Sequence, residues 1–276
     1  MRILAGLFVI PVIFGQADPN PRVDPKALLR QSVENYNHTW RAGMAWAYTS
    51  TDVTESSGEK DVTVTEVIPI AGTPYDRVVV KEGQKLKGED ATREQQKFEK
   101  TCREREKESP SERAARLRKF ESQHAFANDV PNAYDAKLVG EETIAGRPAW
   151  ILELTPRADF RPATTRSAML KHIGARLWID KQDVQWVKAQ AHVLDTISIG
   201  WVMARIGPGA NITYEQTRVA DGLWMPKKIC VEGVAKIFLV HDKDLTETVT
   251  FTGYHRPEPA VLSAGGRATH SAYSDR

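Results

Sequence analysis

Short runs of β-branched and aromatic residues that alternate with polar residues recur along most of this 276-residue chain. Such alternation is typical of strands with one buried face. Three or four runs lie between residues 44 and 80, and a longer series follows residue 134. The later predicted strands span residues 134–142, 147–155, 174–180, 184–194, 197–206, 211–220, 224–232, 234–240 and 245–254, with a turn at residues 242–244. Open twisted sheets rarely exceed about ten strands, so a sheet of eleven or twelve strands is expected to curl or close.

A block of charged residues interrupts this β pattern. Residues 89–121 contain ten basic and nine acidic side chains. Ser109, Pro110 and Glu112 form a capping box with proline at the first helical position, which predicts one helix ending before Ser109 and another beginning at Pro110. The block therefore reads as a helical hairpin over about residues 91–127. Its few apolar residues, Phe98, Leu117, Phe120 and Phe126, bury too little surface for independent folding, so the hairpin must rest on the sheet or stay mobile.

The first 17 residues have the pattern of a secretory signal peptide. Arg2 precedes an apolar run of about a dozen residues, which is short of the roughly 20 needed to span a bilayer. We expect cleavage near Ala17, no stable membrane anchor, and a periplasmic or secreted protein. A helix should follow, capped by Asp24 and ending at Gly43. We predict one domain over residues 18–256 and a disordered tail over residues 257–276.

Charge and cysteine content narrow the possible partners. The net charge of +2 gives no reason to expect nucleic acid as a partner. Cys102 and Cys230 lie far apart in the sequence. In an oxidising compartment they could form one disulfide, or both could be free and buried.

The sequence contains no standard catalytic, phosphate-binding or metal-binding motif. Seven histidines are scattered singly, so no cofactor, metal or catalytic residue is predicted, although a zinc site built from distant positions stays open. Two groups of polar residues lie at predicted strand ends, His241 with Asp242 and Asp244, and Asp180 with Asp183. Polar loops commonly look like this without any function.

Large apolar side chains stand out on the predicted strands. They can be read as the filled core of a barrel, or as the lining of a cavity that a widely curved sheet cannot fill. The candidate lining residues are Trp46, Trp150, Leu152, Trp178, Trp201 and Met203.

Four motifs in the second half resemble strands of the outer-membrane lipoprotein carrier superfamily. They are the G-R-P-A-W-I-L-E-L run from Gly146, the G-A-R-L-W-I-D run from Gly174, the D-G-L-W-M-P run from Asp221 and the F-T-G-Y run from Phe251. The resemblance covers about residues 24–256. It implies a mainly β (α+β) fold, a half-open antiparallel β-barrel of about 11 strands around an apolar cavity, with helices on the open side. Phe98, Leu117, Phe120 and Phe126 would then form a lid.

Three functions follow from these patterns. The first is an exported binding or carrier protein for a lipid, lipoprotein acyl chains or another hydrophobic ligand. The second is an envelope module that docks another protein through the charged hairpin or senses stress. A hydrolase or metal enzyme is a third reading, supported only by scattered histidines and acids.

Overall fold

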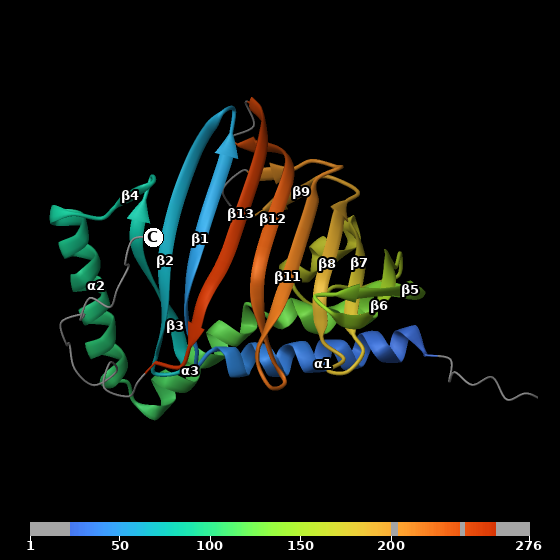
Figure 1. Cartoon of the computed structure of the whole chain (residues 1–276), viewed down its shortest axis with the longest axis horizontal. Coiled ribbons are helices and arrows are strands. Elements are labelled where there is room, and N and C mark those ends of the chain that lie inside the picture. Colours follow the sequence, from blue (N-terminus) through green and yellow to red (C-terminus); the bar gives the residue numbers. More distant parts are fainter. Residues whose placement is uncertain (1–22, 200–203, 238–240, 258–276) are drawn as a thin grey trace, which may run out of the picture.

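The computed structural model describes residues 23–199, 204–237 and 241–257. All thirteen strands in these residues belong to one antiparallel sheet. Eleven strands follow one another in the order β4-β3-β2-β1-β13-β12-β11-β8-β7-β6-β5 (Figure 1). The remaining two, β9 and β10, pair with each other, and β10 also pairs with β12. The strands are β1 (Ala47–Ser56), β2 (Glu59–Ile70), β3 (Thr73–Lys81), β4 (Gln84–Lys85), β5 (Tyr134–Ile144), β6 (Arg147–Pro156), β7 (Ile173–Asp180), β8 (Trp186–Val193), β9 (Ile197–Ile199), β10 (Ala204–Ile206), β11 (Asn211–Ala220), β12 (Leu223–Ile237) and β13 (His241–His255).

The sheet is curved but not closed. Strand β1 pairs with β13 along nearly its whole length, with Thr51 opposite Thr250, so the first and the last described strands lie side by side in the middle of the sheet. The terminal strands of the order, β4 and β5, have no ladder between them in the described residues. The predicted half-open antiparallel barrel of about 11 strands is confirmed.

Three details of the strand prediction are wrong. Residues 223–237 form the single strand β12, and residues 242–244 lie inside β13 rather than in a turn. Gly233 continues the pairing of β12 with β13, opposite Leu245, and glycine is needed there because a Cβ would stand 2.5 Å from the Cβ of Ala210. The predicted strand over residues 197–206 is instead the two short strands β9 and β10.

Helix α1 (Pro25–Gly43) fills part of the concave face. Asp24 accepts a hydrogen bond from the Lys26 amide at its start, as its sequence predicts. Its apolar stripe, including Leu29 and Val33, packs into the same buried cluster as Leu152 of β6 and Leu177 of β7. Figure 1 shows α1 running across the strands along one side of the sheet. The concave space over β5–β8 is therefore core rather than cavity.

The predicted helical hairpin is present as α2 (Gly88–Glu106) and α3 (Pro110–Ser122). The capping box at Ser109 is complete, since its hydroxyl accepts from the Glu112 amide and the Glu112 carboxylate accepts from the Ser109 amide. Neither helix has a fully buried residue. Four short helical segments complete the fold: η1 (Ala125–Asp129), α4 (Val130–Ala133), α5 (Thr165–Ala168) and η2 (Met169–His172).

Helices that could cross a membrane were not found among the described residues. The predicted signal peptide, residues 1–17, and residues 258–276 of the predicted tail lie outside those residues.

Candidate ligand cavity

An aromatic cavity of about 250 Å³ lies where α1 stops covering the sheet. Helix α1, the loop that follows it, the ends of β11 and β12, and the region from α3 to His124 surround this space. Three tryptophans and three tyrosines contribute to its wall: Trp40, Trp46, Trp224, Tyr36, Tyr48 and Tyr214. Lysine and arginine are missing from the wall formed by the described residues. Apolar ligands are therefore the chemical class that the cavity suits best.

The roof of the cavity joins α1 to α3. The ring of Trp40 stacks on Phe120 with centroids 5.5 Å apart and lies 4.0 Å from the ring of His124. At the end of α1, Gly43 lets the helix approach β12 closely, because a Cβ would stand 2.6 Å from the Met225 sulfur. The position of α3 thus depends on aromatic contacts with α1, and these contacts close one side of the cavity.

A chain of buried hydrogen bonds runs behind the cavity wall. The Gln185 side-chain amide donates to Thr39 Oγ1 and to Gln216 Oε1, both at 3.1 Å. Gln216 donates in turn to the Tyr214 hydroxyl at 2.6 Å. The chain therefore links the buried interior to Tyr214 of the cavity wall.

Two polar atoms of the wall residues are buried without a hydrogen-bond partner in the described residues, Trp46 Nε1 and His124 Nδ1. Burial, together with the nearby positive charge of Arg166, lowers the pKa of His124 to about 4. The imidazole is therefore neutral at pH 7. On the other side, the Arg256 guanidinium lies over the Trp46 ring, 5.6 Å from its centroid. A buried polar atom without a hydrogen-bond partner costs free energy, so a state in which Trp46 Nε1 and His124 Nδ1 each have a partner would be more stable.

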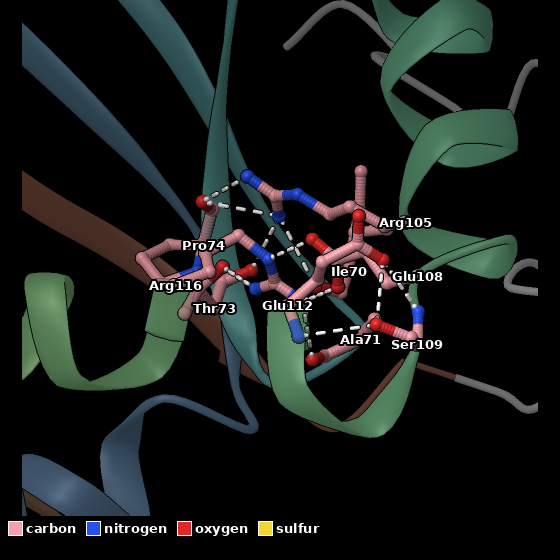
Figure 2. A network of polar contacts seen from close by, with 9 residues as sticks. All are labelled: Ile70, Ala71, Thr73, Pro74, Arg105, Glu108, Ser109, Glu112 and Arg116. Atoms are coloured by element: carbon pink, nitrogen blue, oxygen red, sulfur yellow. Dashed lines mark hydrogen bonds and ion pairs between the residues drawn. The ribbon is translucent and has the colours of Figure 1, made fainter. Parts of the chain in front are cut away.

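Two arginines fix the junction between α2 and α3 to the β2–β3 turn, as Figure 2 shows. Arg105 Nη1 donates to the main-chain oxygens of Ile70 and Thr73 at 3.1 and 2.9 Å. Arg116 Nη2 donates to the main-chain oxygen of Ala71 at 3.1 Å, and Arg116 Nη1 donates to Thr73 Oγ1. We call this group of contacts the elbow anchor.

Glu108 completes the elbow anchor. Its carboxylate accepts from Arg116 Nε at 2.6 Å and also pairs with Nη2, and both side chains are at most 20% exposed. The hydrogen bond from Arg116 is the main reason that the pKa of Glu108 is lowered. Sequence reasoning missed these residues, because an arginine in a charge-rich helix gives no sign that its partners are main-chain carbonyls.

The candidate lining residues fall into three groups. Trp46 lies in the cavity wall. Trp150 and Leu152 pack against the core beneath α1, and Leu152 is completely buried. Trp178 packs with Ala149 and Val187 on the opposite, convex face, while Trp201 and Met203 lie outside the described residues. Hydropathy did not distinguish them, because β6 and β7 carry large apolar side chains on both faces, such as Leu152 on one and Trp178 on the other.

The candidate lid residues are also divided. Phe120 lies in the cavity wall. Phe98 instead contacts β3, with its ring 5.6 Å from Tyr75 and 5.4 Å from the Arg77 guanidinium carbon. Leu117 reaches the β2–β3 turn beside Gly72, and Phe126 is half-buried in η1. Only Phe120 of the four therefore borders the cavity.

Cys102 and Cys230 are both free thiols. Cys102 lies on α2, which packs against β3, whereas Cys230 lies on β12 next to Thr248. Four strand spacings separate β3 from β12, a distance of roughly 19 Å, and a disulfide needs Cα atoms within about 7 Å. The fold keeps the two residues apart.

The acidic residues at the end of β7 are structural. Asp180 is completely buried and accepts two hydrogen bonds of 2.7 Å from Arg147 Nε and Nη2. It also accepts from the amides of Gln182 and Asp183, and Asp183 accepts from Trp224 Nε1 at 2.8 Å. These bonds explain the G-R, W-I-D and G-L-W motifs as one turn-stabilising network. No group of three potential metal ligands occurs among the described residues.

A second, larger hollow of about 600 Å³ lies on the convex face of the sheet. Its wall includes charged and polar residues that share this face through the strand register: Glu153, Arg176, Gln190 and Thr213. Such an open, polar surface is a poor site for an apolar ligand. The smaller aromatic cavity is therefore the better candidate for the binding site.

No protein-family model matches this chain, and no curated protein sequence matches it. Solved structures with a similar fold include two related to the superfamily that the sequence resembles. A LolA superfamily protein from Nitrosomonas europaea is 12% identical, with a TM-score of 0.35, covering 88% of this chain and 98% of its own. An outer membrane lipoprotein-sorting protein domain from Vibrio parahaemolyticus is 9% identical, with a TM-score of 0.34 and coverages of 85% and 97%.

A third similar structure is a DUF1329 family protein from Desulfovibrio piger. It is 10% identical, with a TM-score of 0.36, and the match covers 87% of this chain and all of that chain. All three TM-scores are below 0.5, so these likenesses support no conclusion about activity.

Proposed function

We propose that this protein is an exported, periplasmic binding or carrier protein for a lipid, an acyl chain or another hydrophobic ligand, held in the cavity between α1, α3 and the sheet. The observation that supports this is the aromatic wall itself. A well-packed interior rarely leaves space larger than a water molecule, yet about 250 Å³ is left here between otherwise packed elements.

The volume of the cavity limits the size of the ligand that can bind while α3 stays in place. Small-molecule sites usually measure about 300–1,000 Å³, so this cavity accepts the end of an acyl chain or a small ring. Each buried methylene contributes about 0.8 kcal/mol, and this gain must exceed the cost of association. A longer chain requires α3 to move away from Trp40, and α3 has no fully buried residue to oppose that movement.

The test is whether the cavity binds an apolar probe, and whether a larger side chain in the cavity wall prevents that binding. N-phenyl-1-naphthylamine is titrated into the full chain, and its fluorescence is expected to rise and saturate. Ile229→Trp, which fills the cavity wall, should abolish this rise, whereas Val139→Trp on the exposed edge strand β5 should leave it unchanged. Equal binding by all three proteins would place the probe elsewhere. Native mass spectrometry of protein from its own envelope would then identify the natural ligand.

A second function, docking of another envelope protein, is favoured by the exposure of α2. Phe98, Glu94 and Gln95 of this helix contact β3, and most of its other charged residues are exposed. Several of these charges pair with each other along the helix, as Arg93 does with Asp90 and Arg103 does with Glu99. A partner whose binding depends on salt and is lost when α2 charges are reversed, with probe binding intact, would support docking.

A further inference from the structure

A hollow of about 360 Å³ adjoins the aromatic cavity, and Gln216 and Trp224 border both spaces. The turn between β5 and β6 forms one part of its wall, and β8, β11 and β12 form the rest. Among the described residues, this wall includes one acidic residue, Glu215, and four basic residues: Arg147, Lys188, Arg218 and Lys227. We call this space the basic hollow. Its excess of positive charge favours an anionic ligand.

Both arginines of the basic hollow are held by carboxylates that lie outside its wall. Arg147 donates from Nε and Nη2 to Asp180, both at 2.7 Å, and its Nη2 lies 3.2 Å from Asp183. Arg218 donates from Nε to Asp183 at 3.2 Å, and its Nη2 lies 3.1 Å from Asp221. In the described part of the chain, neither Nη1 atom donates a hydrogen bond. Each guanidinium therefore has a fixed orientation and a donor left for a ligand.

The two lysines are less engaged than the arginines. Lys188 forms no ion pair with a described residue, and its ammonium lies over the Trp178 ring, 4.8 Å from the centroid. Lys227 pairs with Glu215 at 3.5 Å, but the lysine side chain is 60% exposed. Exposed ion pairs contribute little free energy, so a more highly charged anion can replace Glu215 as the partner of Lys227.

The neighbouring aspartates lower the local potential but leave the donors of the basic hollow free. Asp180 is completely buried, and its oxygens already accept from Arg147 and from two main-chain amides. Asp183 accepts from Trp224 Nε1 in addition to its two arginines. Asp221 is fully exposed to water, which screens its charge. Binding therefore depends on direct hydrogen bonds from the cations rather than on a long-range field.

We propose that the basic hollow binds a phosphoryl group, held by Nη1 of Arg147, Nη1 of Arg218 and the ammonium of Lys188. A phosphate monoester carries a charge of about −1.5 to −2 at pH 7 and three strong acceptor oxygens, one for each of these cations. A carboxylate has one charge and two oxygens, so it satisfies fewer donors. This site is independent of the proposed apolar ligand. Soluble phosphate esters and lipid headgroups share the phosphoryl chemistry, and the experiment distinguishes these sources.

The experiment titrates the full chain with glycerol 3-phosphate and with glycerate, in which a carboxylate replaces the phosphate ester. Calorimetry at low salt should show glycerol 3-phosphate binding at least about 10-fold more tightly, with an affinity that falls as salt is added. Equal affinity for the two compounds, or no binding of either, overturns the inference. Co-sedimentation with phosphatidylcholine vesicles, with and without phosphatidic acid, then identifies the source. Retention that requires phosphatidic acid supports a lipid headgroup, whereas binding of glycerol 3-phosphate alone supports a soluble ester.

Matched lysine variants test the location of the site. Lys188→Gln should weaken glycerol 3-phosphate binding roughly 5–20-fold, because one charged contact is lost. Lys137→Gln removes the same charge from an exposed lysine on the same face of the sheet, outside the basic hollow, and should leave the affinity unchanged. Arg218→Gln should weaken binding as Lys188→Gln does. Equal weakening by Lys137→Gln, or unchanged affinity in both hollow variants, overturns the inference, and thermal unfolding checks that each variant is folded.

Discussion

The ring of Trp40 on α1 stacks on the ring of Phe120 on α3, with their planes at 17° to each other. These residues are 80 positions apart in the sequence, and their contact attaches the charged hairpin to the helix that fills the barrel. The same contact forms one side of the cavity. Removal of either ring should therefore loosen the hairpin and open the cavity together.

Phe120→Ala should weaken both the docking of α3 and the retention of ligand. The ring is half-buried, so the loss of about 100 Å² of apolar contact corresponds to roughly 2–3 kcal/mol. Hydrogen exchange of the amides of residues 110–122 should become faster, and N-phenyl-1-naphthylamine should dissociate faster. Phe98→Ala is the control, because Phe98 contacts β3 outside the cavity. Equal effects of the two substitutions would show that Phe120 has no special role.

Arg116→Met should destabilise the elbow anchor. The substitution leaves Glu108 without its partner and frees the Ala71 carbonyl and the Thr73 hydroxyl. Because the pair is only partly exposed, we expect a loss of about 2–3 kcal/mol in the free energy of unfolding, measured by urea titration. Arg93→Met removes an exposed partner of Asp90 and should cost less than about 0.5 kcal/mol. A loss below that of Arg93→Met would mean that the anchor is not stabilising.

The protein should lose stability as the pH falls from about 6.5 to about 4. The pKa of His124 is about 4 in the folded protein, mainly because the ring is buried, and 6.5 in the unfolded chain. The unfolded chain therefore binds more protons in this interval, which favours unfolding, and the effect levels off below pH 4. For a partly exposed ring we expect about 1–2 kcal/mol.

The substitution His124→Phe isolates this effect from the titration of carboxylates. It keeps an aromatic ring against Trp40 but removes the proton-binding site. The difference in unfolding free energy between the wild type and the variant should change between pH 6.5 and pH 4. A difference that stays constant over this interval would show that His124 does not titrate there.

Asp180→Asn should be the most damaging single substitution in the turn network. The carboxylate is completely buried and accepts from Arg147 twice and from two main-chain amides. Neutralising it leaves the arginine charge unmatched, at a cost of about 3–5 kcal/mol in the free energy of unfolding. Asp221→Asn, at the fully exposed partner of Arg218, should change that free energy by less than about 0.5 kcal/mol. Urea titration of both variants distinguishes a structural Asp180 from an incidental one.

Local signals in the sequence predict the helices well. The proline and capping residues at Asp24 and Ser109 define the starts of α1 and α3, because caps act within one turn of the chain. The strand pattern likewise predicts a sheet that must curve. The turn at residues 242–244 is wrong because these polar residues continue β13, where Asp242 pairs with Lys236 and Asp244 pairs with Val234 of β12.

The site could be predicted only in part. Trp46 and Trp178 look equivalent in the sequence, since each is a tryptophan beside apolar residues on a predicted strand. A bulge between Trp178 and Ile179, and the path of α1 over β5–β8, decide which faces become core. The buried hydrogen bond from Gln185 to Thr39 joins residues 146 positions apart, and no local pattern reports such a pairing.

The elbow anchor recognises main-chain oxygens at Ile70, Ala71, Thr73 and Pro74, and only one of its contacts to that turn uses a side chain. Substitutions at Ile70, Ala71 or Pro74 that keep the turn geometry therefore leave the hydrogen bonds from Arg105 and Arg116 intact. The hairpin and the turn are free to diverge in sequence independently of each other. Homologous chains should consequently conserve the two arginines and the length of the turn more strictly than the identity of the turn residues.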